Sequence, residues 1–168
     1  MKKIISLVMS AVLCSTMAIT ASANEYKAGN VKVTVNGTKY SVLGYEVPGS
    51  GYGVKLRTIA TILNGTSKQF NVGFSDGVVD ISIGEGYTAL GTELGQYTGT
   101  EPAGAYSTHM FKINGELSGI EATLASDYNY VPLENFIYGI LGPVVITYDE
   151  DGGVVIDTES EISEEDWG

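Results

Sequence analysis

Val31, Val33 and Val35 lie at every second position, with polar residues between them. Apolar residues with a period of two are typical of a strand that buries one face. The Asn36-Gly37 pair that follows favours the positive φ angles of a two-residue hairpin turn. The pattern therefore predicts a strand over residues 31–35, a tight turn and a returning strand.

A different period follows the flexible bend at Gly49-Ser50-Gly51. Over residues 56–63 the apolar side chains recur with the spacing of one face of a two-turn helix. These expected core residues are Leu56, Ile59, Ala60 and Leu63. Asn64-Gly65 ends the helix as a C-terminal cap. Alternating apolar residues on either side of Ser75-Asp76-Gly77 then predict a second hairpin.

The same succession of segments returns in the second half of the chain. Ile113-Asn114-Gly115 repeats Val35-Asn36-Gly37, and an offset of 77 residues relates Val54 to Val131. The expected core face of the second helix consists of Leu133, Phe136, Ile137 and Ile140. A closing hairpin follows over residues 144–156. Internal repetition of this kind indicates a folding unit smaller than the chain.

The repetition predicts an α+β fold of two tandem small repeats, each an antiparallel sheet curled against one short helix. The first repeat covers residues 24–83 and the second residues 109–158. Residues 84–108 are rich in Gly, Ser, Thr and Ala, and we interpret them as a connector. Since a unit of about 50 residues buries only a small core, we expect the repeats to pack on each other or on the connector.

The order of these motifs resembles the N-terminal stalk domain of copper amine oxidases, which many exported bacterial proteins also carry. That family has a Val-Asn-Gly turn, a helix start of the form Y-V-x-L-R-x-x-A, a Gly at the helix end and a closing V-x-I strand. The matching segments are Val35-Asn36-Gly37, Val54 to Ala60, Gly65, Phe74-Ser75-Asp76 and Val79-Asp80-Ile81, and then Ile113-Asn114-Gly115, Tyr130 to Leu133, Gly142, Tyr148-Asp149 and Val154-Val155-Ile156. The second half departs from the family where Glu134 replaces the Arg and Ile137 the Ala.

The resemblance implies small α+β units and does not imply oxidase chemistry, which in that family resides in a separate, larger domain. That chemistry needs several histidine copper ligands and a quinone made from the Tyr of an N-Y-D/E sequence. The chain has one histidine, His109, and Asn129-Tyr130 is followed by Val131. We therefore expect no cofactor, no stoichiometric copper and no catalytic activity.

Residues 1–23 have the features of a secretory signal peptide. Lys2 and Lys3 precede an apolar stretch, and Ala21-Ser22-Ala23 is an A-x-A cleavage site. The alternative of a membrane anchor is disfavoured because the stretch is short and contains several Ser and Thr residues. We expect a secreted, extracellular bacterial protein that can associate with the cell wall.

Charge narrows the range of partners. Cleavage after Ala23 leaves 7 Lys and Arg residues against 20 Asp and Glu residues, a formal charge of −13. Such a field repels nucleic acid, anionic lipid and anionic wall polymers. We expect a macromolecular partner, either a protein or an uncharged glycan, with no nucleic acid and no membrane after signal cleavage. Residues 159–168 are expected to form an acidic disordered tail.

Two groups of residues resemble metal sites only superficially. Asp149, Glu150 and Asp151 precede Gly152-Gly153, but the bidentate Glu of an EF-hand loop is missing and a hairpin turn is expected here. His109 has no partner ligands in the sequence pattern. We expect no metal site, and weak calcium binding at residues 149–151 stays open.

Tyrosine is the one composition bias that a function could explain, at 11 Tyr against 4 Phe and 1 Trp. A Tyr ring stacks on sugars while its hydroxyl forms hydrogen bonds, and Tyr128, Asn129 and Tyr130 cluster in an expected loop. The simpler interpretation is that Tyr is a common strand residue. We expect a secreted, non-catalytic structural or binding module. The alternatives are a glycan-binding accessory module that uses Tyr-rich loops and an unrecognised hydrolase.

Overall fold

A computed structural model describes residues 26–160. The predicted signal peptide and all but the first two residues of the predicted tail lie outside this range. The elements of the first half are β1 (Ala28–Val35), β2 (Thr38–Val47), β3 (Gly51–Lys55), α1 (Leu56–Ile62), β4 (Phe70–Ser75) and β5 (Val78–Ile83). Those of the second half are β6 (Ala105–Ile113), β7 (Glu116–Ala125), β8 (Tyr128–Pro132), α2 (Leu133–Phe136), the π-helical turn η1 (Ile137–Leu141), β9 (Val145–Tyr148) and β10 (Val154–Asp157).

All of these strands belong to one sheet of ten strands, in the order β4-β5-β6-β7-β8-β3-β2-β1-β10-β9. The sheet is mixed, because β1 pairs with β10 and β5 with β6 in parallel, while the other pairs are antiparallel. The predicted fold of two tandem α+β repeats, each with its own antiparallel sheet, is therefore wrong. The two halves share one sheet, and helices make up little of the described chain.

The closing hairpin of each half joins the strands of the other half. The β4–β5 hairpin extends the sheet beside β6, and the β9–β10 hairpin extends it beside β1. Alternating apolar residues and turn residues predict where a hairpin forms, but they are the same for pairing within a half and between halves. The sequence pattern could not distinguish these two arrangements.

The two Asn-Gly turns hold in place the exchanged hairpins, which are the β4–β5 and β9–β10 hairpins that pair with the other half. The backbone N–H of Asn36 donates to the carbonyl of Ile156 at 3.0 Å, and Asn36 Oδ1 accepts from the N–H of Thr158 at 2.9 Å. Asn114 repeats the arrangement with Ile81 and Ile83, in both cases at 2.9 Å. Both asparagines have positive φ, of 46° and 50°. Each Asn therefore forms its turn and also binds a strand of the other half.

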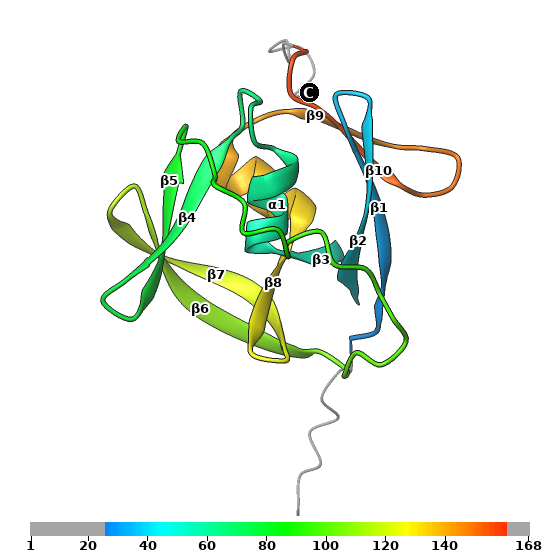
Figure 1. The fold of residues 1–168 in the computed structure, drawn as a ribbon, viewed down its shortest axis with the longest axis horizontal. Helices are drawn as coiled ribbons and strands as arrows, with labels where there is room; N and C mark the ends of the chain where they lie inside the picture. Colours follow the sequence, from blue (N-terminus) through cyan, green and yellow to red (C-terminus); the bar gives the residue numbers. More distant parts are fainter. Residues whose placement is uncertain (1–25, 161–168) are drawn as a thin grey trace, which may run out of the picture.

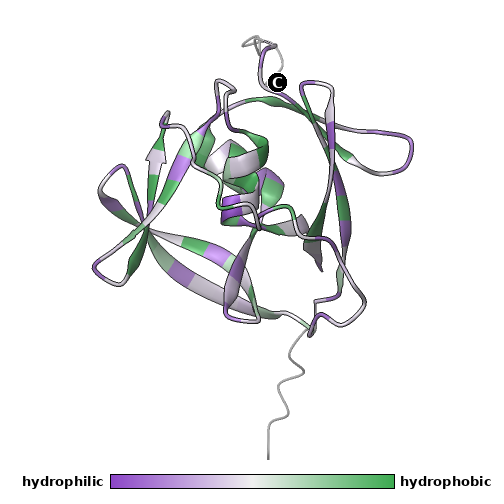
Figure 2. Cartoon of the chain, viewed as in Figure 1, coloured by the Kyte–Doolittle hydropathy of each residue, from purple (hydrophilic) through white to green (hydrophobic). Residues whose placement is uncertain are grey.

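One apolar core serves both halves. Figure 1 shows the sheet curling round the helices, which lie in the middle of the view. The main buried cluster draws on both halves, and Figure 2 shows hydrophobic residues along the helices and the strands around them. The fully buried large side chains of this cluster are Phe70, Phe111, Phe136, Ile59, Ile62, Leu63, Ile81, Leu133, Ile137 and Ile156.

The two helices differ in length and form. Helix α1 ends before Gly65, which has a φ of 81°, whereas α2 runs on into η1 and ends at Gly142, with a φ of 83°. Of the residues predicted for the two helical core faces, all are buried except Ile140, which is partly exposed and packs against the core. Within residues 26–160, no helix has the length and apolar character to span a membrane.

Residues 84–104, in the predicted connector, follow a defined path. Tyr87 is buried in the main core, and the N–H of Leu43 in β2 donates to the carbonyl of Gly95. Tyr26 and Gly104 then form an isolated antiparallel bridge, with two hydrogen bonds of 3.0 Å. The last part of the predicted connector, from Ala105, is already strand β6.

Candidate functional site

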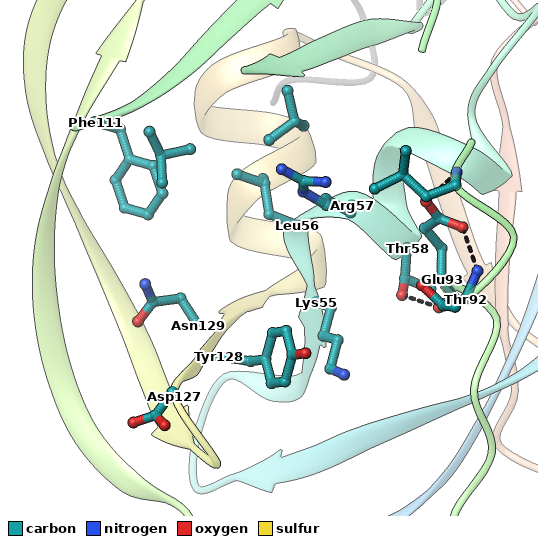
Figure 3. A pocket seen from close by; sticks show the side chains of 13 residues that line it. Lys55, Leu56, Arg57, Thr58, Thr92, Glu93, Phe111, Asp127, Tyr128 and Asn129 are labelled. Carbon is teal, nitrogen blue, oxygen red and sulfur yellow. Dashed lines mark hydrogen bonds between the residues drawn. The ribbon is translucent and has the colours of Figure 1, made fainter. Parts of the chain in front are cut away.

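A cavity of about 420 Å³ opens where both halves and the connector meet (Figure 3). Side chains from the sheet, from the start of α1 and from the connector form its apolar part, and three short segments carry its polar groups. The apolar residues are Leu56, Val72, Val79, Leu90 and Phe111, and the others are Lys55, Arg57, Thr58, Thr92, Glu93, Asp127, Tyr128 and Asn129. The volume falls within the range of small-ligand sites, about 300–1,000 Å³.

The exchange of hairpins creates this cavity. Val72 and Val79 come from the hairpin of the first half, and Phe111 comes from β6 of the second half, which pairs with β5. If each hairpin had paired within its own half, as the sequence pattern predicted, Val72 and Val79 would not line the same cavity as Phe111. The site is therefore a property of the whole fold.

A cation lies on an aromatic ring at the cavity. The Nζ of Lys55, at the end of β3, is 3.8 Å from the centroid of the Tyr128 ring and 5.7 Å from that of Tyr130. Such contacts contribute about 0.5–1 kcal/mol at exposed sites. Burial lowers the pKa of Lys55, because the charged ammonium is disfavoured away from water.

Asn129 contributes an unused hydrogen-bond acceptor. Its Oδ1 is buried and has no hydrogen-bond partner among residues 26–160. A buried polar atom without a partner costs about 1–3 kcal/mol.

The third segment of the cavity is a turn of the connector that Glu93 holds together. The Glu93 carboxylate accepts hydrogen bonds from the N–H groups of Leu90, Gly91 and Thr92, at 2.6 to 2.9 Å, and from the hydroxyl of Tyr87 at 2.9 Å. These donors, the Leu90 N–H first among them, lower the pKa of Glu93 to about 2. The turn is fixed to α1 because Thr58 Oγ1 donates to the Glu93 carbonyl.

A second turn of the same kind lies further along the connector. Glu101 accepts from the N–H groups of Thr98, Gly99 and Thr100, at 3.0 to 3.1 Å. The two turns share the sequence Gly-Thr-Glu, at residues 91–93 and 99–101, and both glycines have a φ of 90°. The sequence patterns did not predict Lys55, Arg57 or Glu93 as site residues, and this repeated tripeptide is the signal that could have identified Glu93.

The tyrosine cluster predicted as a ligand contact is divided by the structure. Tyr128 and Asn129 line the cavity, and Tyr128 is 56% exposed. Tyr130 is buried and packs edge-on against Tyr45, with ring centroids 4.6 Å apart. Only the first two residues of the cluster are therefore placed to contact a ligand in the cavity.

The residues considered as metal ligands have other contacts. His109 Nε2 is hydrogen-bonded to Ser107 Oγ at 2.7 Å. Asp149 Oδ1 accepts from the N–H groups of Asp151 and Gly153, while Asp151 forms an ion pair with Lys32 at 3.0 Å. In the described part of the chain, no group of three or more His, Cys, Asp or Glu side chains is placed to hold a metal ion.

The arrangement is suited to holding a small polar ring. Apolar side chains can exclude water from one side of a ligand, and the tyrosine ring and the two cations can fix its orientation. No family model, curated protein or solved structure matches the chain.

Proposed function

We propose that the chain is an exported, non-catalytic binding module that holds one sugar residue of a glycan in this cavity. The observation that carries the proposal is the exposed ring of Tyr128, which lies beside Asn129 and the ammonium of Lys55 in a cavity with apolar side chains. Sugars offer an apolar ring face and a rim of hydroxyl groups, so they complement the aromatic ring and the polar groups beside it. The resemblance to stalk domains is consistent with a module that binds and spaces.

The cavity is also largely preformed. Glu93 holds its connector turn through four hydrogen bonds, and strand pairing fixes β3 beside β8. A preformed site loses less conformational entropy when it binds a ligand. This property favours recognition of a small group even when few contacts are available.

The proposal is tested by affinity electrophoresis of the chain from Asn24 onward, in gels that contain soluble polysaccharides, both neutral (xyloglucan, mannan) and acidic (polygalacturonate). We expect retardation in at least one gel, loss of retardation in Tyr128→Ala, and no loss in Tyr106→Ala. Tyr106 is a matched control because it is 59% exposed and does not line the cavity.

Two results would contradict the proposal. One is that no gel retards the chain, or that Tyr128→Ala migrates as wild type does. The other is the release of new reducing ends or cleaved products from any of these glycans by repurified protein, which would make the chain an enzyme.

The second candidate is a mechanical spacer, which the pairing of β1 with β10 favours. These strands run in parallel, and Figure 1 places the first and last described residues on opposite sides of the molecule. Force applied at the two ends would slide the strands along each other and load all their hydrogen bonds at once. Single-molecule pulling should show a lower unfolding force for Asn36→Gly, which loosens this pair, than for Asn114→Gly, which loosens β5–β6. Equal forces would exclude this shear geometry.

A further inference from the structure

Two cationic side chains at the cavity lack an ionic partner. Among residues 26–160 the ion pairs are Lys32 with Asp151 and Lys112 with Asp76, so neither Lys55 nor Arg57 takes part in one. Arg57 is near the hydroxyl of Tyr87, a group without charge. An anion beside Lys55 would favour the charged ammonium that burial disfavours.

The approximate symmetry of the fold provides an internal comparison. By the offset of 77 residues, the counterparts of Lys55 and Arg57 are Pro132 and Glu134. Both pairs occupy the same junction, at the end of a central strand and the start of a helix. Since that junction forms equally well with a proline and an acid, the fold itself does not require the two cations.

The equivalent region of the second half is filled and has the opposite charge. Glu134 lies against Gly51, where an added Cβ would be 2.8 Å from Oε1. Its carboxylate accepts a hydrogen bond from Tyr148, which raises the pKa of that tyrosine to about 12. By the same symmetry the counterpart of Tyr128 is Gly51. The tyrosine ring and the cations therefore lie together at only one of the two symmetry-related sites.

Neither acid at the cavity raises the pKa of Lys55, which burial alone lowers, whereas Arg57 and the Glu93 carboxylate lie near the same Tyr87 hydroxyl. The Glu93 carboxylate is occupied by its four hydrogen bonds within the connector. Asp127 is exposed in the turn between β7 and β8 and forms no ion pair with a described residue. The overall charge of −11 disfavours anions at long range, but salt screens that field beyond about 8–10 Å. Contacts inside the cavity act at shorter distances.

We infer that the sugar held in the cavity is a uronic acid, whose carboxylate pairs with Lys55. This inference rests on the proposed glycan-binding function and names its ligand class. It replaces the uncharged glycan expected from net charge alone. The ring of the uronate would lie beside Tyr128 and the apolar side chains of the sheet.

Isothermal titration calorimetry with matched oligosaccharides tests the inference. The probes are trigalacturonate and triglucuronate, each against its neutral hexose counterpart, and a triglutamate peptide as a carboxylate that is not a sugar. We expect one uronate to bind at least about tenfold more tightly than its neutral counterpart, since one charge-assisted hydrogen bond contributes that much. Its affinity should fall as salt rises from 50 to about 300 mM.

Variants locate the charge effect. Lys55→Gln should lower uronate affinity by about tenfold more than it lowers neutral affinity, and Arg57→Gln should have the smaller effect on uronate affinity. Lys39→Gln, at an exposed lysine away from the cavity, should have no effect, and Asp127→Asn should strengthen uronate binding. The circular dichroism spectrum and melting temperature of each variant confirm that it is folded.

The outcomes separate this inference from the proposed function. Equal binding of neutral and acidic probes, lost in Tyr128→Ala, would overturn the uronate assignment and keep the glycan-binding function. Tighter binding of the triglutamate peptide than of either uronate probe would show that the cavity recognises a carboxylate and not a sugar. Absence of binding by every sugar probe, neutral and acidic, would overturn the proposed function itself.

Discussion

Val54 of β3 lies opposite Val131 of β8, and both side chains are completely buried. They are also the two residues that the offset of 77 equates. A residue that pairs with its own counterpart lies on an axis of approximate two-fold symmetry. The axis therefore passes through the centre of the shared sheet, and the two halves cannot be separated without breaking strand pairs.

The shared sheet predicts cooperative unfolding of both halves. Leu133→Ala truncates a fully buried side chain and leaves a cavity. It should lower the free energy of unfolding by about 2–5 kcal/mol. Native-state hydrogen exchange should show the same loss of protection for the slowest amides of β1 and of β6. Leu117→Ala, at a position that is 62% exposed, serves as the control. It should change neither the free energy of unfolding nor the protection of these amides. Loss confined to β6–β8 would mean that the halves unfold independently.

Asn36 and Asn114 are predicted to stabilise the exchange of hairpins. Gly tolerates positive φ at these positions, so Asn→Gly removes only the side-chain hydrogen bonds. We expect each variant to lose about 1 kcal/mol or more of unfolding free energy in urea. Ser126→Gly is the matched control, because Ser126 has a φ of 48° and forms no side-chain hydrogen bond among the described residues. If all three variants were equally stable, the asparagine contacts would contribute nothing.

Glu93 should make stability depend on pH in the acidic range. Its pKa is lowered from 4.5 to about 2 in the folded chain, so folding favours the ionised form. The stabilisation is present above the unfolded pKa and is lost as the pH falls from about 4.5 towards 2. Melting temperatures should show Glu93→Gln less stable than wild type at pH 6, with the difference shrinking as the pH approaches 2.

The control for that experiment is Glu116→Gln, at an exposed residue with no hydrogen bond from its side chain in the described structure. It should follow the wild-type curve across the whole range. A gap between wild type and Glu93→Gln that stays constant down to pH 2 would show that the carboxylate charge is not the stabilising feature.

Export is predicted to remove residues 1–23. Intact-mass measurement of the chain from the medium of a bacterial host should give a protein that begins at Asn24. Metal analysis of the same sample should find no stoichiometric copper. A chain that retains Met1 in the membrane fraction would contradict the localisation, and one tightly bound copper per chain would contradict the expected lack of a cofactor.

Local patterns predicted local structure, and they did so for a physical reason. Alternating valines fix a strand, and Asn36-Gly37 fixes a two-residue turn, whatever the strand later pairs with. Strand partners depend on contacts between distant residues, and neither half contains the information that β5 pairs with β6. The π-helical form of η1 likewise left no trace in the apolar spacing of residues 137–141.

The cavity was harder to predict than the strands, because it depends on those distant pairings. Tyr128 and Asn129 were recognised from composition, since tyrosine and amide side chains suit sugars. Lys55 and Arg57 were not, because two cations in an acidic chain look like ordinary surface residues until Tyr128 is placed beside Lys55. Tyr130 is buried because it packs against Tyr45, a residue distant in the sequence, so its different role from the exposed Tyr128 could be seen only in the structure.

The most direct test of the binding account is a two-dimensional NMR titration of the isotope-labelled chain with trigalacturonate. We predict that the shifted amides fall in residues 55–58, 90–93 and 127–129, the three segments at the cavity. The symmetry-related residues 132–135 and 50–52 should stay unchanged, because Glu134 occupies that region. Shifts on the outer face of the β6–β7 hairpin, around Met110 and Leu117, or no shifts at millimolar sugar, would contradict the account.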